Sequence, residues 1–153
     1  MRDRNHKLIE SNGVLKDLPF TLTVAMVTIA AFFALHPSVV SFLSERFLGG
    51  SYGDAGLYVW LVQSFVKNPL TALRFETNAF YPYPLTRAWS DSFLLPSALV
   101  YALMTWAGVS LTAAYNIVLT SALGMNAAAS YGLAQRVGVS APYAAAVGIL
   151  FAN

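Results

Sequence analysis

Residues Leu18 to Leu35 read LPFTLTVAMVTIAAFFAL, and this stretch sets the fold class. It lies within residues 18–44, none of which carries a charged side chain. At about 1.5 Å per residue, an apolar helix of this length matches the roughly 30 Å hydrocarbon core of a bilayer. Pro19 suits a first helical turn, and His36-Pro37 predicts an end or a kink, because proline disfavours helix in the residue before it. We therefore predict a first transmembrane helix at residues 18–42.

The composition also indicates a membrane protein, with the lipid bilayer as its first partner. The 153 residues are 57% hydrophobic and 10% charged, whereas a soluble domain usually carries about 25% charge. The net charge of +2 and the lack of a basic, aromatic-interleaved patch argue against nucleic acid as a partner. The chain has no cysteine, which excludes disulfides and thiolate metal sites.

Residues 1–17, MRDRNHKLIESNGVLKD, form a polar tail that we expect to be disordered or interfacial. Its basic residues predict a cytoplasmic N-terminus by the positive-inside rule. A signal peptide is the rival interpretation, but the apolar part is too long and no small-x-small cleavage site with a soluble domain follows. Arg136, which this topology puts outside after the third span, is one observation against it.

Residues 92–153 are expected to hold the remaining spans. Residues 92–135 are uncharged, and Gly108-Val109-Ser110 is the turn-like place to fold them. We predict a second span at 92–107 and a third at 111–135. A fourth span, starting near Pro142, stops at residue 153 before it is long enough to cross a bilayer. The expected fold is thus an all-α polytopic transmembrane bundle, and this chain is expected to be part of a longer protein.

The third predicted span is rich in small residues, which let neighbouring helices approach closely in lipid. Asn116 and Asn126 also lie on it. For both we favour an interhelical hydrogen bond, worth about 1 kcal/mol or less, over a role in substrate binding.

Residues 43–91 form a long polar and aromatic loop between the first two spans. Loops of this length are uncommon unless they are functional or have structure of their own. Within it, DAGLYVWLVQSFVKNP predicts a helix from Asp54 to about Lys67, stopped by Pro69. The following NAFYPYPLTRAWSDS suits an extended, packed loop.

One face of the predicted 54–67 helix is apolar. Leu57, Leu61 and Phe65 are spaced by four, and Trp60 lies on the same side. Such a face predicts a helix that lies in the membrane interface, with its aromatic side chains at headgroup depth.

Four stretches resemble the N-terminal region of polytopic membrane glycosyltransferases of the GT-C superfamily: GDAGLYVW, NPLTALRFETNAFYPYP, SDSFLLPSALVYALMTWAGVS and AAYNIVLTSALGMNAAASYGLAQRVG. The resemblance implies an enzyme that moves a sugar from a polyprenyl-phosphate-type carrier to an acceptor on the outer membrane face. It also implies further transmembrane helices beyond this chain, without which the chain should be inactive. Some members use a divalent metal and many do not, so the cofactor stays open. We expect the plasma membrane of a prokaryote.

The resemblance implies that an acid in the first outer loop is the essential group. Asp54 best matches that position, and Asp91 is a second acid at the same membrane face. The residue pattern leaves two roles open for Asp54. Aspartate suits a helix N-cap, and a partly desolvated carboxylate suits a general base for an attacking hydroxyl.

Cations and aromatics in the same loop are the candidates for substrate binding. Arg74 and Arg87 are candidates for the positive charge that a phosphate leaving group needs, with headgroup contact or ordinary ion pairing as the favoured alternative. Tyr58, Trp60 and Tyr83 are candidates for stacking on the sugar or cradling the isoprenoid, and the interfacial aromatic belt explains them at least as well.

A non-enzymatic membrane scaffold or assembly protein is the alternative function. Transport is disfavoured, because a transporter is expected to carry a charged residue inside a span and the three predicted complete spans carry none.

Overall fold

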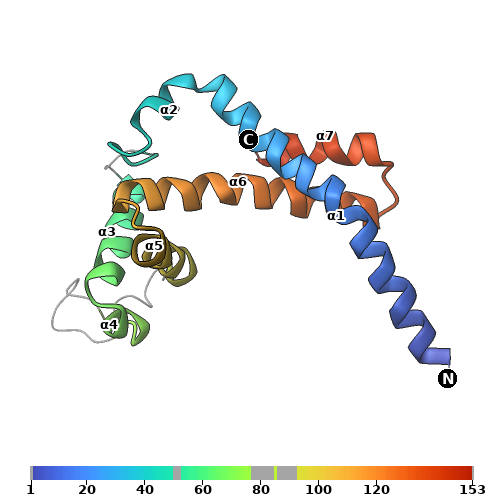
Figure 1. The fold of residues 1–153 in the computed structure, drawn as a ribbon, viewed down its shortest axis with the longest axis horizontal. Helices are drawn as coiled ribbons and strands as arrows, with labels where there is room; N and C mark the ends of the chain where they lie inside the picture. The colour runs from blue at the N-terminus through green and yellow to red at the C-terminus, as the bar shows by residue number, and fades with distance from the viewer. Residues whose placement is uncertain (1, 50–52, 77–84, 86–92, 153) are drawn as a thin grey trace. The chain divides into compact units, whose positions relative to one another are not determined.

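The computed structural model describes residues 2–49, 53–76, 85 and 93–152, with side chains described from residue 18 onward. Within these residues the chain is helical and has no strand, which confirms the all-α fold class (Figure 1). The helices are α1 Arg2–Leu35, α2 Pro37–Phe42, α3 Gly53–Lys67, α4 Pro69–Leu73, α5 Leu94–Ala107, α6 Leu111–Arg136 and α7 Ala141–Ala152.

The helices belong to two compact units. The first comprises Met1–Pro37 with Thr120–Asn153, and the second comprises Ser38–Leu119. Helix α6 contributes its first turns to the second unit and the rest of its length to the first.

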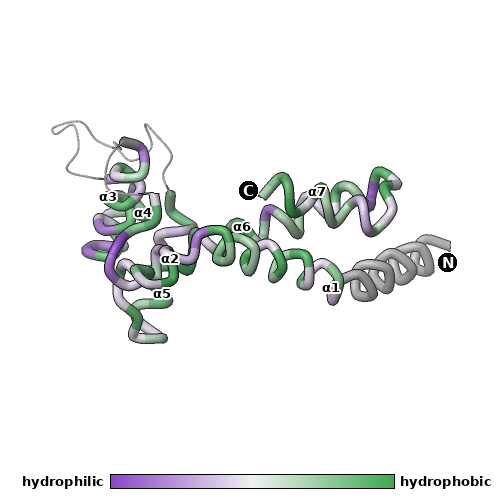
Figure 2. The backbone as a smooth tube through the Cα atoms, turned by 90° about the horizontal axis from the view of Figure 1, so that it is seen from above, coloured by the Kyte–Doolittle hydropathy of each residue, from purple (hydrophilic) through white to green (hydrophobic). Residues whose placement is uncertain are grey.

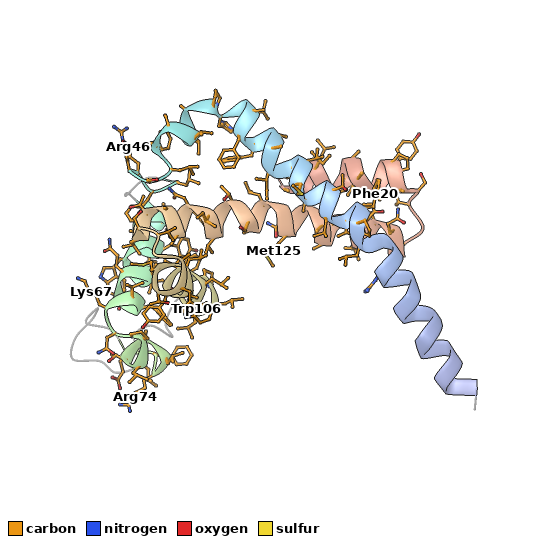
Figure 3. All side chains as sticks on the ribbon, in the orientation of Figure 1. Phe20, Arg46, Lys67, Arg74, Trp106 and Met125 are labelled. Atoms are coloured by element: carbon orange, nitrogen blue, oxygen red, sulfur yellow. The ribbon has the colours of Figure 1, made fainter. Side chains whose placement is uncertain are left out.

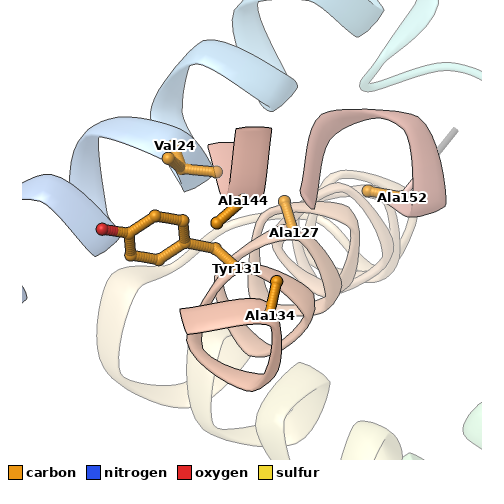
Figure 4. Close-up of a cluster of buried hydrophobic side chains, with 6 residues drawn as sticks. All are labelled: Val24, Ala127, Tyr131, Ala134, Ala144 and Ala152. Atoms are coloured by element: carbon orange, nitrogen blue, oxygen red, sulfur yellow. The ribbon is translucent and has the colours of Figure 1, made fainter. Parts of the chain in front are cut away.

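The first unit packs α1 and α7 on one face of α6. A small buried cluster joins them (Figure 4): Val24, Ala127, Tyr131, Ala134, Ala144 and Ala152. Most of these side chains are alanine, so the helices lie close together, as small residues allow in membrane proteins. The closest approach is at Gly148 of α7, where an added Cβ would lie 2.6 Å from the carbonyl oxygen of Ala127. The predicted close packing of small residues on the third span is therefore present.

Two segments are long and apolar enough to cross a membrane, Leu18–Leu35 in α1 and Leu111–Arg136 in α6, judged by length and composition. Only 11% of the first and 28% of the second is buried inside the protein. The core helix of a soluble protein would be mostly buried, whereas these helices leave most of their apolar surface open. Hydrophobic residues predominate along the coloured part of α1 and along α7 (Figure 2).

Several predicted boundaries agree with the structure. Helix α1 ends at Leu35, directly before His36-Pro37, and α7 begins one residue before Pro142. Gly108 ends α5 with a φ of 66°, so the predicted turn is present and α6 starts at Leu111. A difference lies at the N-terminus, where α1 already begins at Arg2. The polar tail is therefore helical, which contradicts its expectation as a disordered segment.

The predicted second span is shorter than a bilayer. Helix α5 has 14 residues, which at about 1.5 Å per residue gives roughly 21 Å. It is an apolar helix but not one of the two segments long enough to cross a membrane. The structure therefore supports two candidate spans in place of the three complete spans that we predicted.

The second unit is built on the packing of α3 against α5. Its core is formed by valines of both helices and the first turns of α6: Val59, Val62, Val100, Ala114 and Tyr115. This packing corrects the prediction for the apolar face of α3. Leu61 and Phe65 are buried at 1% and 4% exposure, while Leu57 and Trp60 are 41% and 37% exposed. The predicted interfacial face is thus half protein core, because α5 supplies a partner that the α3 sequence alone does not reveal.

Candidate functional site

Asp54 lies in the first turn of α3, and its side chain is exposed. The helix already begins at Gly53, so Asp54 is inside the helix and not at the N-cap position that we considered. A carboxylate in the first turn still interacts favourably with the helix dipole, by about 0.3–1 kcal/mol. Because the side chain is exposed, the described residues do not provide the partial desolvation expected of a general base.

The segment before α3 lies against this first turn. Gly49 has a φ of +85°, a conformation that glycine adopts without a steric penalty. A Cβ at Gly49 would lie 3.2 Å from the Cβ of Ala55, the neighbour of Asp54. The end of residues 43–49 therefore lies close to the first turn of α3.

Asn116 of α6 holds these residues. Its side chain is fully buried, and its Nδ2 donates to the carbonyl oxygens of Leu43 at 2.7 Å and Arg46 at 2.8 Å. Its Oδ1 accepts a hydrogen bond of 2.8 Å from the backbone N–H of Leu48. One amide thus pairs three backbone groups of a part-buried, non-helical segment, which has no regular helix to supply these bonds. We call these contacts the Asn116 clasp.

Aromatic side chains line the next turn of α3. Tyr58, one turn after Asp54, lies on Phe93 with 4.8 Å between ring centroids and 31° between ring planes. Phe93 has a φ of 50°, which is uncommon for a residue with a side chain. Its carbonyl oxygen accepts hydrogen bonds from the backbone N–H of Ser97 at 3.1 Å and from Ser97 Oγ at 2.6 Å. These bonds stabilise the conformation that brings the Phe93 ring to Tyr58.

The structure separates the candidate aromatic residues. Trp60 is exposed, whereas Tyr58 is half-buried against Phe93. Trp60 follows Asp54 by six positions, or about 9 Å along the helix axis. Six positions also turn the helix by about 120°, so Trp60 is not brought to the acid, while one face of Tyr58 is occupied by Phe93.

Arg74 lies beyond the far end of α3 from Asp54. Thirteen positions separate Asp54 from Lys67, which places them roughly 20 Å apart along the helix axis. The short α4 then leads to Arg74, which is exposed at the end of α4 (Figure 3). Arg74 is therefore not brought to the candidate acid, because the straight α3 lies between them.

The backbone at the end of α4 explains why the chain turns there. Phe75 N–H donates to the Ala72 carbonyl and Glu76 N–H to the Thr71 carbonyl, at 3.0 and 3.1 Å. This is the Schellman arrangement, with Phe75 at a φ of 59° in the position usually held by glycine. Arg74 is therefore fixed at a helix end by its own backbone.

The other candidates, Asp91, Arg87 and Tyr83, lie outside the described residues. Among the residues that the structure describes, no three His, Cys, Asp or Glu side chains gather in a group that could hold a metal ion.

Two residues of the Asn116 clasp were not among the predicted site residues. Asn116 was expected to bond another helix, and its partners are loop backbone groups instead. Arg46 is an exposed cation three positions before Gly49, and its carbonyl is part of the Asn116 clasp. It lies far from Arg74 in Figure 3. In the sequence, Asn116 stands out only as a polar residue within a long uncharged stretch. That pattern does not show which groups its side chain bonds.

Comparison of the chain with known protein families, with characterised proteins and with solved structures finds no match. The resemblance to the GT-C superfamily therefore depends on the sequence stretches alone.

Proposed function

We propose that this chain is part of an integral membrane glycosyltransferase of GT-C type. It would move a sugar from a polyprenyl-phosphate-type carrier to an acceptor on the outer membrane face, with Asp54 as its catalytic acid–base residue. The observation that carries the proposal is an exposed carboxylate in the first turn of α3, one turn before Tyr58, whose ring lies against Phe93. The two long apolar helices support a membrane location.

The reaction can be written for the residues of this chain. Asp54 accepts the proton of the acceptor hydroxyl while that oxygen bonds to the anomeric carbon of the sugar. The bond from that carbon to the carrier phosphate breaks, and the phosphate leaves with the electron pair. General-base assistance of this kind contributes about 10²- to 10⁴-fold to the rate. The Trp60 side chain is exposed, which keeps it a candidate for stacking on the sugar.

Positive charge is needed where the phosphate leaves. Arg46 is a further candidate besides Arg74, because the Asn116 clasp fixes its backbone three residues before Gly49, which lies against the first turn of α3. Asp91, Arg87 and Tyr83 stay candidates in the proposal for the same site, on the strength of the sequence alone. A bound divalent metal, where one is used, would supply further positive charge for the leaving phosphate.

Transfer from polyprenyl-linked radiolabelled sugars should be measured in membranes that contain the complete gene product. Asp54→Asn should lower transfer by about 10²-fold or more at unchanged expression. Glu76→Gln removes an exposed acid just after α4, beyond the far end of α3, and is the matched control, expected to keep wild-type activity. Wild-type turnover by Asp54→Asn would refute the assignment of Asp54. No transfer by the wild-type protein from any donor would favour the non-enzymatic scaffold.

A further inference from the structure

Helices α1 and α6 run in opposite directions within the first unit. Phe20, near the start of the candidate span in α1, packs on Tyr131, near the end of α6, with 5.3 Å between ring centroids. Farther along α1, a Cβ added at Gly124 would lie 2.8 Å from Ile29 Cδ1 and 3.3 Å from the carbonyl oxygen of Ala25. Residue numbers therefore rise along α1 as they fall along α6, which makes the pair antiparallel.

This direction limits how the chain between the two helices can cross a membrane. If α1 and α6 both cross, an antiparallel pair requires an even number of crossings between them. Among the described residues between 38 and 110, α5 is the only apolar helix of ten residues or more. Its 14 residues extend about 21 Å, short of the roughly 30 Å core of a bilayer. A single crossing by α5 would make α6 parallel to α1, contrary to the contact between Phe20 and Tyr131.

The charge pattern agrees with this arrangement. Arg136 is exposed in the last turn of α6, at the end of the α1–α6 pair where the candidate span of α1 begins. The basic residues of the tail precede that same end: Arg2, Arg4, Lys7 and Lys16. The positive-inside rule counts Lys and Arg within about 15–20 residues of a span, so these five cations all favour one cytoplasmic side.

The segment between the two candidate spans also carries cations: Arg46, Lys67, Arg74 and Arg87. Segments longer than about 60 residues cross a membrane largely regardless of their charge, so these cations do not oppose an outer position for residues 38–110.

We propose that α1 and α6 form a hairpin that crosses the bilayer twice, with residues 38–110 entirely on the outer side. Arg136 and the turn after it then lie at the cytoplasmic surface, where the phosphate groups of anionic lipids bind the arginine together with the basic tail. This arrangement reverses the outer position that the three-span prediction gave to Arg136. The proposal requires α1 and α6 to lie in a membrane, and it does not depend on glycosyl transfer.

Cysteine accessibility in intact cells tests the hairpin. The chain has no cysteine, so single cysteines can be placed in the complete gene product, with any cysteine outside residues 1–153 replaced by serine. Val137 follows α6 and is 72% exposed, and Ala107 is an exposed residue at the end of α5. We expect an impermeant maleimide to label Ala107→Cys in intact cells and Val137→Cys only after permeabilisation. Three crossings by α1, α5 and α6 would give the reverse pattern.

A third position separates no crossing between α1 and α6 from two. Lys67 is exposed at the end of α3. The hairpin predicts that Lys67→Cys is labelled in intact cells, whereas crossings by both α3 and α5 would protect it until permeabilisation. Ser140→Cys, at an exposed position between α6 and α7, repeats the Val137 measurement, so that the result does not depend on the folding of one variant.

Two results would overturn the proposal. One is labelling of Val137→Cys or Ser140→Cys in intact cells, and the other is protection of Ala107→Cys or Lys67→Cys until permeabilisation. Either result would leave the assay of sugar transfer unaffected, because that assay depends on Asp54 and not on the side of Arg136.

Discussion

The Oδ1 atom of Asn116 accepts a hydrogen bond from the backbone N–H of Leu48 at 2.8 Å, joining two residues separated by 68 positions in the chain. This bond and the two that Asn116 donates bring the end of residues 43–49 to the start of α6. The contact links one of the two candidate spans to the segment that precedes Asp54.

Replacement of Asn116 should loosen residues 43–49. Asn116→Ala leaves two part-buried carbonyls and one N–H without this partner, and each lost hydrogen bond contributes about 0.5–1.5 kcal/mol. We expect the amide of Leu48 to exchange hydrogen at least about thirtyfold faster, measured by mass spectrometry in detergent. Ser121→Ala removes an exposed polar group of the same helix and should leave this exchange unchanged. Equal exchange in both variants would contradict the importance of the clasp.

Gly148 should tolerate no side chain. A Cβ there would lie 2.6 Å from the Ala127 carbonyl oxygen, a backbone atom that cannot rotate away, so Gly148→Ala must push α7 from α6. We expect destabilisation by about 1–3 kcal/mol in thermal unfolding in detergent. Gly132→Ala on α6 is the control, since a Cβ at Gly132 meets nothing within 4 Å. That variant should be neutral or more stable by up to about 1 kcal/mol. A neutral Gly148→Ala would show that the helices are less closely packed.

The end of α6 should depend on backbone conformation at Gly138. Its φ is +89°, and a Cβ there would meet nothing within 4 Å, so any loss on substitution is conformational. Gly138→Ala should destabilise by about 1 kcal/mol, Gly138→Asn by less and Gly138→Val by more, because asparagine tolerates this region and β-branched residues do not. Thermal unfolding of the three variants measures this order. A reversed order would mean that side-chain contacts dominate at this turn.

The side of the membrane that α3 faces can be measured directly. Four basic residues, Arg2, Arg4, Lys7 and Lys16, precede the first candidate span, so the tail should be cytoplasmic and Asp54 outside. In the cysteine-free background, Asp54→Cys should react with an impermeant maleimide in intact cells. Ser11→Cys in the tail should react only after permeabilisation. Labelling in the opposite pattern would remove Asp54 from the outer face and with it the proposed reaction.

Helix positions were predictable wherever a local signal exists. The proline after His36, the Gly108-Val109-Ser110 turn and Pro69 each mark a boundary that the structure confirms, because proline and glycine act through their own backbone geometry. The second predicted span, residues 92–107, corresponds to α5, Leu94–Ala107, which is shorter than the two helices long enough to cross a membrane. The partners of Leu61, Phe65 and Asn116 were not predictable, because they come from segments about 35 to 70 positions away.

Composition and hydrophobic pattern were enough to predict an all-helical chain with segments long and apolar enough to cross a bilayer. Both properties can be read from each segment by itself. They also identified Asp54 as an acid at the start of a helix. Long-range packing was needed to turn Leu61 and Phe65 inward, to leave Trp60 exposed and to bind residues 43–48 to Asn116. The reason is that a side chain's burial and hydrogen-bond partner depend on which distant surface covers it, and a one-dimensional pattern does not contain that information.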